Sequence, residues 1–259
     1  MRRHYRAIPE YYDAEYESME MLRRDVPFLI EHLPKKPVSI LELMAGTGRV
    51  AIPLAQAGHQ VTGVDFDNRM LVIARRKRDA VSIANARLRF VHQNALRLSL
   101  PQRFDWAVIL FNSFLTFTAL RDQDRVLQNA RKHLKPGGNF WLDVFNPNLS
   151  MLAEKRSVDL TPKTFFVHSM GRTVSQLADI VRDTGTQSQV VTFRYKWFDA
   201  RGRERRERRS FSMTYIMPRE LRILLERNGF VIREIFGDYR GGPVTSDSPR
   251  LIAHCVRPR

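Results

Sequence analysis

A glycine turn followed by a single acid is the part of the sequence best suited to chemistry. Gly46 and Gly48 follow an apolar stretch at 38–43, and Asp65 ends a second apolar stretch about 20 residues later. Glycine allows positive φ and lets the turn press its amides against a small molecule, with the helix expected at 49–57 behind it. A carboxylate at the position of Asp65 can accept hydrogen bonds from ribose hydroxyls. The pattern predicts a strand–turn–helix–strand unit that binds a nucleoside cofactor.

The residue just before the turn helps to decide which cofactor binds. Residues 46–51 also fit the dinucleotide pattern G-x-G-x-x-A, so a nicotinamide oxidoreductase is one alternative. Glu42, however, would repel a pyrophosphate and attract a cation, either directly or through water. S-adenosylmethionine carries a sulfonium and an ammonium but no phosphate. Glu42 therefore favours S-adenosylmethionine over a dinucleotide.

Longer motifs resemble a known family. The stretch Leu-Glu-Leu-Met-Ala-Gly-Thr-Gly-Arg at 41–49 is similar to motif I of the class I S-adenosylmethionine-dependent methyltransferases. The stretches at 63–71, 92–95 and 134–138 follow in the order of that family. The resemblance implies an α/β fold, a Rossmann-like seven-stranded methyltransferase sheet with helices on both faces. It also implies methyl transfer from S-adenosylmethionine, with S-adenosylhomocysteine as the product.

The resemblance assigns cofactor contacts to individual residues of this chain. Asn94 stands where the family usually has an acid that binds the adenine amino group, and Met44 replaces the usual first glycine of motif I. Phe66 is expected to contact the adenine ring or to join the core, and an N-terminal tyrosine is expected to fold over the cofactor. The expected cofactor-binding residues are Tyr11, Tyr12, Glu42, Met44, Ala45, Gly46, Thr47, Gly48, Asp65, Phe66, Met70, Asn94, Ala95 and Phe111.

Composition limits the class of protein. The 259 residues suffice for one large α/β domain or for a domain with an insertion. Cys255 is the only cysteine, which excludes a disulfide framework and a cysteine-cluster zinc site, and no metal is expected. We find no apolar run long enough to cross a bilayer and no signal peptide, so a cytoplasmic protein is expected. The oligomeric state stays open.

Three segments are expected along the chain. Residues 1–37 form an N-terminal helical cap or lid, and residues 38–147 together with 218–259 form the cofactor-binding core. Residues 148–217 form an inserted antiparallel β-sheet, since Phe193, Tyr195 and Trp197 alternate along an expected strand. Its aromatic face either packs against the core or covers the substrate pocket.

The acceptor of the methyl group is predicted from position. Asn112 and Asn146 end the fourth and fifth strands, whose carboxyl ends border the ligand crevice, and Tyr239 lies in a loop near the C-terminus. No catalytic base follows from residue spacing. The arrangement resembles that of small-molecule enzymes such as the sugar N-methyltransferases, which predicts methylation at nitrogen or oxygen. The alternatives are an RNA or protein methyltransferase that uses the basic stretch Arg201–Arg209, in a chain of net charge +16, and a binding domain without catalysis.

Overall fold

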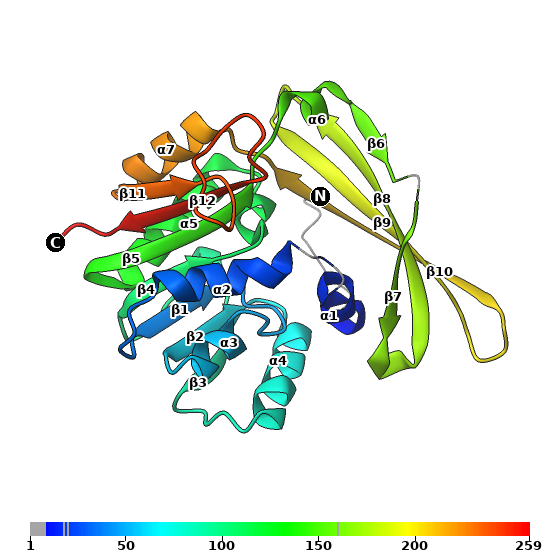
Figure 1. Ribbon diagram of the computed structural model, residues 1–259, viewed down its shortest axis with the longest axis horizontal. Helices are drawn as coiled ribbons and strands as arrows, with labels where there is room; N and C mark the ends of the chain where they lie inside the picture. The colour runs from blue at the N-terminus through cyan, green and yellow to red at the C-terminus, as the bar shows by residue number, and fades with distance from the viewer. Residues whose placement is uncertain (1–8, 18, 20, 160) are drawn as a thin grey trace.

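A seven-stranded sheet, sheet A, forms the centre of the fold in the computed structural model, which describes residues 9–17, 19, 21–159 and 161–259 (Figure 1). The strand order is β11-β12-β5-β4-β1-β2-β3, and β12 alone runs antiparallel to its neighbours. This confirms the expected methyltransferase sheet. The strands are β1 (Ser39–Leu43), β2 (Gln60–Asp65), β3 (Leu88–His92), β4 (Phe104–Ile109), β5 (Leu134–Phe145), β11 (Val231–Phe236) and β12 (Arg250–Val256).

Helices cover both faces of sheet A because its central strands are apolar on both sides. In β1, Ile40 packs with α2, α3 and α4, whereas Leu41 and Leu43 pack with α5 and α7. The helices are α2 (Leu22–His32), α3 (Ala51–Gln56), α4 (Asn68–Ala80), α5 (Leu120–His133) and α7 (Pro218–Arg227), with short 3-10 turns at η1 (Ala95–Arg97) and η2 (Ser113–Thr116).

Two element boundaries differ from the sequence prediction. The helix expected at 49–57 begins only at Ala51, because Arg49 and Val50 still belong to the glycine turn. The apolar stretch Phe140–Phe145 predicts that the fifth strand begins at Phe140. It begins at Leu134 instead, because Leu134 pairs with Phe104. A register shift between Phe104 and Trp106 accommodates the Pro136–Gly138 stretch within the strand.

A second, antiparallel sheet, sheet B, follows β5 as the sequence predicted. Four of its strands lie in the order β10-β9-β8-β6, and β7 pairs with β8. Short α6 (Leu149–Ala153) leads into it, and η3 (His168–Met170) connects β7 to β8. The strands are β6 (Arg156–Val158), β7 (Lys163–Val167), β8 (Arg172–Asp183), β9 (Ser188–Phe198) and β10 (Glu204–Thr214).

Helix α1 (Pro9–Glu17) lies between the two sheets (Figure 1). The Tyr11 ring packs against Phe165, Tyr195 and Trp197 of sheet B, at centroid distances of 6.5, 5.2 and 6.0 Å. From another side of the helix, Asp13 accepts a 2.6 Å hydrogen bond from the Thr47 hydroxyl and pairs with Lys77 at 3.0 Å. Helix α1 therefore links sheet B to the glycine turn and to α4.

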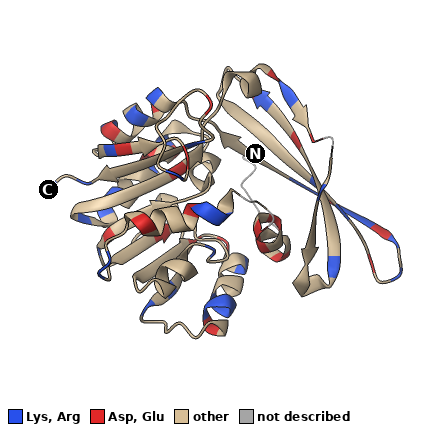
Figure 2. Ribbon diagram, in the orientation of Figure 1, with Lys and Arg blue, Asp and Glu red and all other residues tan. Residues whose placement is uncertain are grey.

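The arginines of the β9–β10 hairpin are interspersed with a few acids at the end of sheet B remote from the core (Figure 2). Arg203 and Arg205 both pair with Asp199, which also shapes the turn by accepting from the Arg201 and Arg203 amides. Farther along β10, Arg206 pairs with Glu204 and Arg209 with Glu207. The basic stretch is thus largely occupied by local ion pairs on an exposed hairpin.

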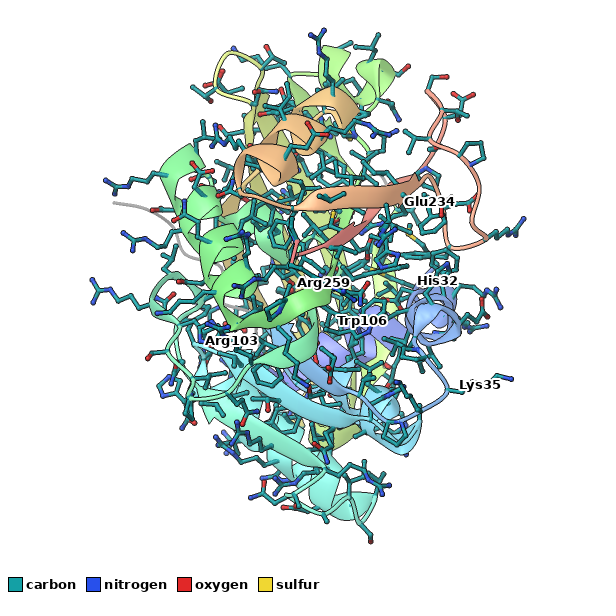
Figure 3. The ribbon with its side chains drawn as sticks, turned by 90° about the vertical axis from the view of Figure 1, so that its left-hand side faces the viewer. His32, Lys35, Arg103, Trp106, Glu234 and Arg259 are labelled. Atoms are coloured by element: carbon teal, nitrogen blue, oxygen red, sulfur yellow. The ribbon has the colours of Figure 1, made fainter. Side chains whose placement is uncertain are left out.

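Charged side chains, including Lys35, Arg103, Glu234 and Arg259, lie on the face of the molecule remote from sheet B (Figure 3). Trp106 lies near the middle of this view but is buried, with its ring stacked on His254 at 5.3 Å. Every helix in the described ranges is too short or too polar to cross a membrane.

A buried ion pair joins β5 to β12. The Arg250 Nε and Nη2 atoms donate to Asp143 Oδ1 at 2.9 and 2.6 Å, and both side chains are at most 2% exposed. Asp143 Oδ2 accepts from the Tyr239 hydroxyl at 2.8 Å and from the Phe111 amide at 3.2 Å. The cluster therefore ties two strands and two connecting segments together, and its charges are compensated only while both partners are present.

We expect Arg250→Ala to lower the free energy of unfolding by about 3–5 kcal/mol, because Asp143 would remain buried without its cation. Urea denaturation followed by circular dichroism measures this change. The matched control is Arg24→Ala, because Arg24 forms an exposed ion pair with Glu31 at the long distance of 3.8 Å. This variant should change the free energy of unfolding by less than about 0.5 kcal/mol. Equal unfolding midpoints for the two variants would show that the buried pair does not hold the fold together.

Candidate functional site

Two neighbouring cavities lie at the carboxyl ends of the strands of sheet A. The larger, of about 400 Å³, extends from the glycine turn to the inner face of sheet B. The smaller, of about 160 Å³, lies over the end of β3. Both are lined by Met44, Asp65, Phe66 and Thr116, so the two cavities adjoin. Adjoining cavities at this edge of a parallel sheet are the expected place for a nucleoside.

Asp65 ends β2 at the junction of the two cavities. Its Oδ2 accepts from the Gly46 amide and its Oδ1 from the Asp67 amide, both at 2.8 Å. Burial raises the pKa of the Asp65 carboxyl, while these backbone hydrogen bonds act in the opposite direction. Each carboxylate oxygen retains a lone pair after these bonds. Asp65 is therefore fixed by the turn and can still accept from a vicinal diol.

The two glycines of the turn have different roles. Gly46 has φ of +55° and faces the larger cavity, where an added Cβ would lie 3.4 Å from Met70 Cε. Gly48 has φ of +78°, and an added Cβ would lie 2.8 Å from the Phe90 ring. Gly48 therefore lets the turn pack closely on β3. Of the predicted turn residues, Met44 and Gly46 line the cavity, whereas the structure places Ala45, Thr47 and Gly48 behind it.

Glu42 lies beneath the turn, and neither cavity is lined by it. It is 4% exposed, and its Oε2 has no hydrogen-bond partner among the described residues. Burial raises the pKa of the Glu42 carboxyl to about 8, although the Arg49 guanidinium favours the charged form. Arg49 is itself held by both oxygens of Asp25 at 3.0 and 2.6 Å. The carboxyl is thus close to losing its proton whenever a positive charge approaches.

The smaller cavity is lined by the residues predicted to hold an adenine. Asn94 and Ala95 line it at the end of β3. Asn94 Oδ1 already accepts from the Leu96 amide at 2.9 Å and so begins the η1 turn, but one of its lone pairs remains. Phe66 is 45% exposed and lines both cavities, so it is not a core residue and its ring is accessible to a ligand.

The tip of β4 forms another wall of the larger cavity. Phe111 and Asn112 both have positive φ, +48° and +63°, a conformation that L-residues rarely adopt. Asn112 Oδ1 accepts from the Phe145 amide at 2.7 Å, and Asp143 holds the Phe111 amide. The guanidinium groups of Arg49 and Arg250 lie 5.7 and 5.5 Å from the centre of the Phe111 ring. The turn is therefore held from several sides, and Asn112 reaches the cavity as predicted.

Besides Glu42, Ala45, Thr47 and Gly48, three more predicted site residues lie away from the cavities. Tyr11 is buried against sheet B, so of the two N-terminal tyrosines only Tyr12 lines the larger cavity, with Tyr16 one helical turn later. Asn146 is turned into the 245–248 loop, where its Nδ2 donates to the Thr245 and Ser248 carbonyls. Tyr239 lies beneath the β4 tip, where its hydroxyl donates a hydrogen bond to Asp143. The position of Asn146 at a strand end did not indicate whether its side chain would point toward the cavity or toward a loop.

Sequence reasoning missed Asp143, Arg250 and Arg49. The signal for Asp143 was available, because it is the one charged residue in the apolar stretch Phe140–Phe145. A lone acid within a buried strand requires a partner. Nothing in the sequence indicated that this partner would be Arg250, more than 100 residues away. Arg49 stood within the motif, but its bond to Asp25 depends on how α2 packs.

The far wall of the larger cavity comes from sheet B. Strands β8, β9 and β10 present alternate residues to it, most of them apolar: Ala178, Ile180, Val191, Phe193, Phe211 and Met213. Arg182 and Gln189 continue the same face at one end, and Glu15 of α1 lines the cavity as well. The inserted sheet therefore covers the pocket, which was one of the two roles expected of its aromatic face.

Comparison with known proteins agrees with this geometry. Residues 40–138 match the family model described as a methyltransferase domain. The chain is 36% identical over 128 residues to a demethylmenaquinone methyltransferase of Thermus thermophilus, and this match spans 48% of the chain and only 54% of that relative. It is 25% identical to a cypemycin N-terminal methyltransferase of a Streptomyces species, over 88% of the chain and 86% of that protein.

Solved structures share the fold over most of the chain. The CcbJ methyltransferase of Streptomyces caelestis superposes with a TM-score of 0.73 at 25% identity, covering 90% of the chain and 93% of that structure. CalS10, an amino pentose methyltransferase of Micromonospora echinaspora solved with S-adenosylmethionine bound, gives a TM-score of 0.72 at 18% identity over 98% and 100% of the two chains. Taken with the glycine turn, Asp65 and the paired cavities, these matches show a methyltransferase domain at residues 40–138 and the fold of the class I S-adenosylmethionine-dependent methyltransferases over the chain.

Proposed function

We propose that the protein transfers a methyl group from S-adenosylmethionine to a nitrogen or oxygen atom of a small molecule. The observation that carries this proposal is the continuous space between the strand ends and sheet B. One end has the acid, the glycine turn and the adenine-sized cavity that a nucleoside needs. The other end is closed by side chains of the inserted sheet, which leaves room for a compact acceptor beside the cofactor.

The described residues fit S-adenosylmethionine better than a phosphate-bearing cofactor. Asp65 would accept from the ribose hydroxyls, Asn94 and Phe66 would receive the adenine, and Tyr12 and Met70 would enclose the rest. The unpartnered Glu42 Oε2 beneath the turn suits a ligand of positive charge. When bound, the cofactor supplies a sulfonium-activated methyl group. The protein then has to align the acceptor and exclude water.

Enclosure also favours a small molecule over a nucleic acid. Sheet B and α1 cover the strand ends, with the cavity between them. The arginines of the β9–β10 hairpin lie at the opposite end of sheet B, where acids pair with most of them. An enzyme for structured RNA would instead need cations converging on an open cleft. Helix α1 serves as the inner part of the lid in this proposal, because Tyr12 and Tyr16 line the cavity.

We expect Asp65→Ala to weaken S-adenosylmethionine binding by roughly 10- to 150-fold, because a charged acceptor for two ribose hydroxyls contributes about 1.5–3 kcal/mol. Isothermal titration calorimetry measures the affinity, and thermal unfolding shows whether the variant is folded. Asp79→Ala is the matched control, because Asp79 lies on α4 with its side chain 64% exposed. Unchanged affinity in a folded Asp65→Ala variant would refute the ribose assignment.

The raised pKa of Glu42 predicts a pH-dependent affinity. Below pH 8 the carboxyl is largely protonated, and the positive charge of the cofactor favours its ionised form. Binding should then release a proton, so the affinity should rise between pH 6 and pH 8 by up to about tenfold per unit. Calorimetry in two buffers of different ionisation enthalpy counts the protons released.

The control for this pH dependence is Glu42→Gln, which keeps the shape of the side chain and cannot titrate. Any pH dependence that comes from the cofactor's own amino group persists in this variant. The difference between the two proteins therefore isolates Glu42. Identical pH profiles would show that the cofactor's charge does not reach the carboxyl beneath the turn.

The hairpin arginines test the RNA alternative. Replacing Arg201, Arg203, Arg205 and Arg206 with glutamine should leave S-adenosylmethionine affinity unchanged and should hardly alter the salt dependence of binding to a single-stranded RNA oligonucleotide. If these residues bind phosphates, the slope of log K against log salt instead falls by about 0.7 for each phosphate of a single strand that the variant no longer neutralises. A decrease equivalent to several phosphates would support the RNA alternative.

A further inference from the structure

A buried arginine and a buried glutamine face each other across two strands on the wall of the larger cavity. Arg182 of β8 and Gln189 of β9 are direct partners in the antiparallel register. They are 5% and 6% exposed, and both line the cavity. This pair is polar on a face of sheet B that is otherwise mainly apolar.

Arg182 uses only part of its hydrogen-bonding capacity within the protein. Its Nη1 donates to the Glu154 carbonyl at 3.0 Å and to the Ser157 hydroxyl at 2.6 Å, which anchors the segment after α6. Its Nε has no partner among the described residues, and neither has Gln189 Oε1 across the strand. The two unmet groups lie on facing residues and are of opposite kind, a donor on Arg182 and an acceptor on Gln189. An anionic ligand can accept from Arg182 Nε, whereas Gln189 has to turn its amide nitrogen toward such a ligand and its oxygen toward a donor.

No carboxylate among the described residues forms an ion pair with Arg182. The Glu154 carboxylate comes near it only through the Ser157 hydroxyl, which donates to Glu154 Oε2 at 2.7 Å. A guanidinium removed from water without an anionic partner is costly, so an anion that enters the cavity would compensate this charge. The planar guanidinium is also the side chain best matched to carboxylate and phosphate oxygens.

The neighbours of the pair define the rest of the ligand. Met213 of β10 is the register partner of Gln189. Ile180 and Val191 form another register pair, which lies two residues along each strand from Arg182 and Gln189. All three hydrophobic side chains line the same cavity. The anionic group must therefore be attached to an apolar portion that lies against them, between Arg182 and the β4 tip.

From this arrangement we infer that the acceptor carries an anionic oxygen group, a carboxylate or a phosphate, which binds Arg182 and Gln189 at the end of the cavity formed by sheet B. The amide of Gln189 can donate to the same group. Only the identity of the ligand as the methyl acceptor rests on the proposed function. The anion subsite itself is a property of the cavity and can be measured without turnover.

The probe is octanoate, whose alkyl chain suits the apolar wall and whose carboxylate suits Arg182. Its neutral counterpart is 1-octanol, and octyl phosphate distinguishes phosphate from carboxylate recognition. Binding is measured by calorimetry on the full chain, with and without S-adenosylhomocysteine. We expect octanoate or octyl phosphate to bind at least roughly tenfold more tightly than 1-octanol. Equal affinities for all three probes in the wild type would overturn the inference.

Two variants and a control locate the effect. Arg182→Gln should abolish the preference for the anionic probe and leave the affinity for 1-octanol unchanged. Gln189→Glu should do the same, because it places a carboxylate directly opposite Arg182, and it should raise the melting temperature by compensating the buried charge. Arg194→Gln, on the exposed face of the same sheet, should retain the preference.

If Arg182→Gln fails to fold, Gln189→Glu still tests the inference. We expect Gln189→Glu to fold because it adds an ion pair to the protein. Persistence of the anion preference in a folded Arg182→Gln or Gln189→Glu variant would overturn the inference. Failure of the proposed function has a different signature. In that case S-adenosylhomocysteine does not bind, while discrimination between octanoate and 1-octanol is still abolished in Arg182→Gln.

Discussion

The buried pair formed by Asp143 and Arg250 is the interaction on which the site depends. It lies between β5 and β12, and the same carboxylate holds the Phe111 amide and the Tyr239 hydroxyl. Two consecutive residues with positive φ follow β4, and such a turn persists only when its surroundings fix it. The ion pair, the Asn112 bond to Phe145 and the stacked guanidiniums fix this one. The geometry of the cavity wall is thus maintained by charges that do not line the cavity.

Much of the fold could be predicted from the sequence because its signals are local. Glycines at a turn, an acid at a strand end and alternating aromatic residues each reflect the conformation of a few neighbouring residues. The order of the motifs then supplied the topology of sheet A, including the antiparallel final strand. The boundaries of α3 and β5 were less well predicted, since they depend on pairing with distant strands such as the contact of Leu134 with Phe104.

The site was predicted only in part, because the sequence does not show in which direction a side chain points. A strand end tells where a residue lies along the sheet, but not whether its side chain meets a ligand or a loop. Asn112 reaches the cavity, whereas Asn146 binds the carbonyls of the 245–248 loop. In α1 the two adjacent tyrosines diverge, so that Tyr12 lines the cavity and Tyr11 packs on sheet B. Arg182 and Gln189 could not be recognised from the sequence, because their importance comes from an absence of partners within the described residues.

Helix α1 has one further consequence for how the two ligands act on each other. Asp13 binds the glycine turn, while Tyr11 and Glu15 of the same short helix contact Tyr195 of sheet B. The same helix thus connects the turn that would hold the cofactor to the wall against which an acceptor would rest. Any effect of one ligand on the affinity of the other that passes through this helix must be equal in the reverse direction.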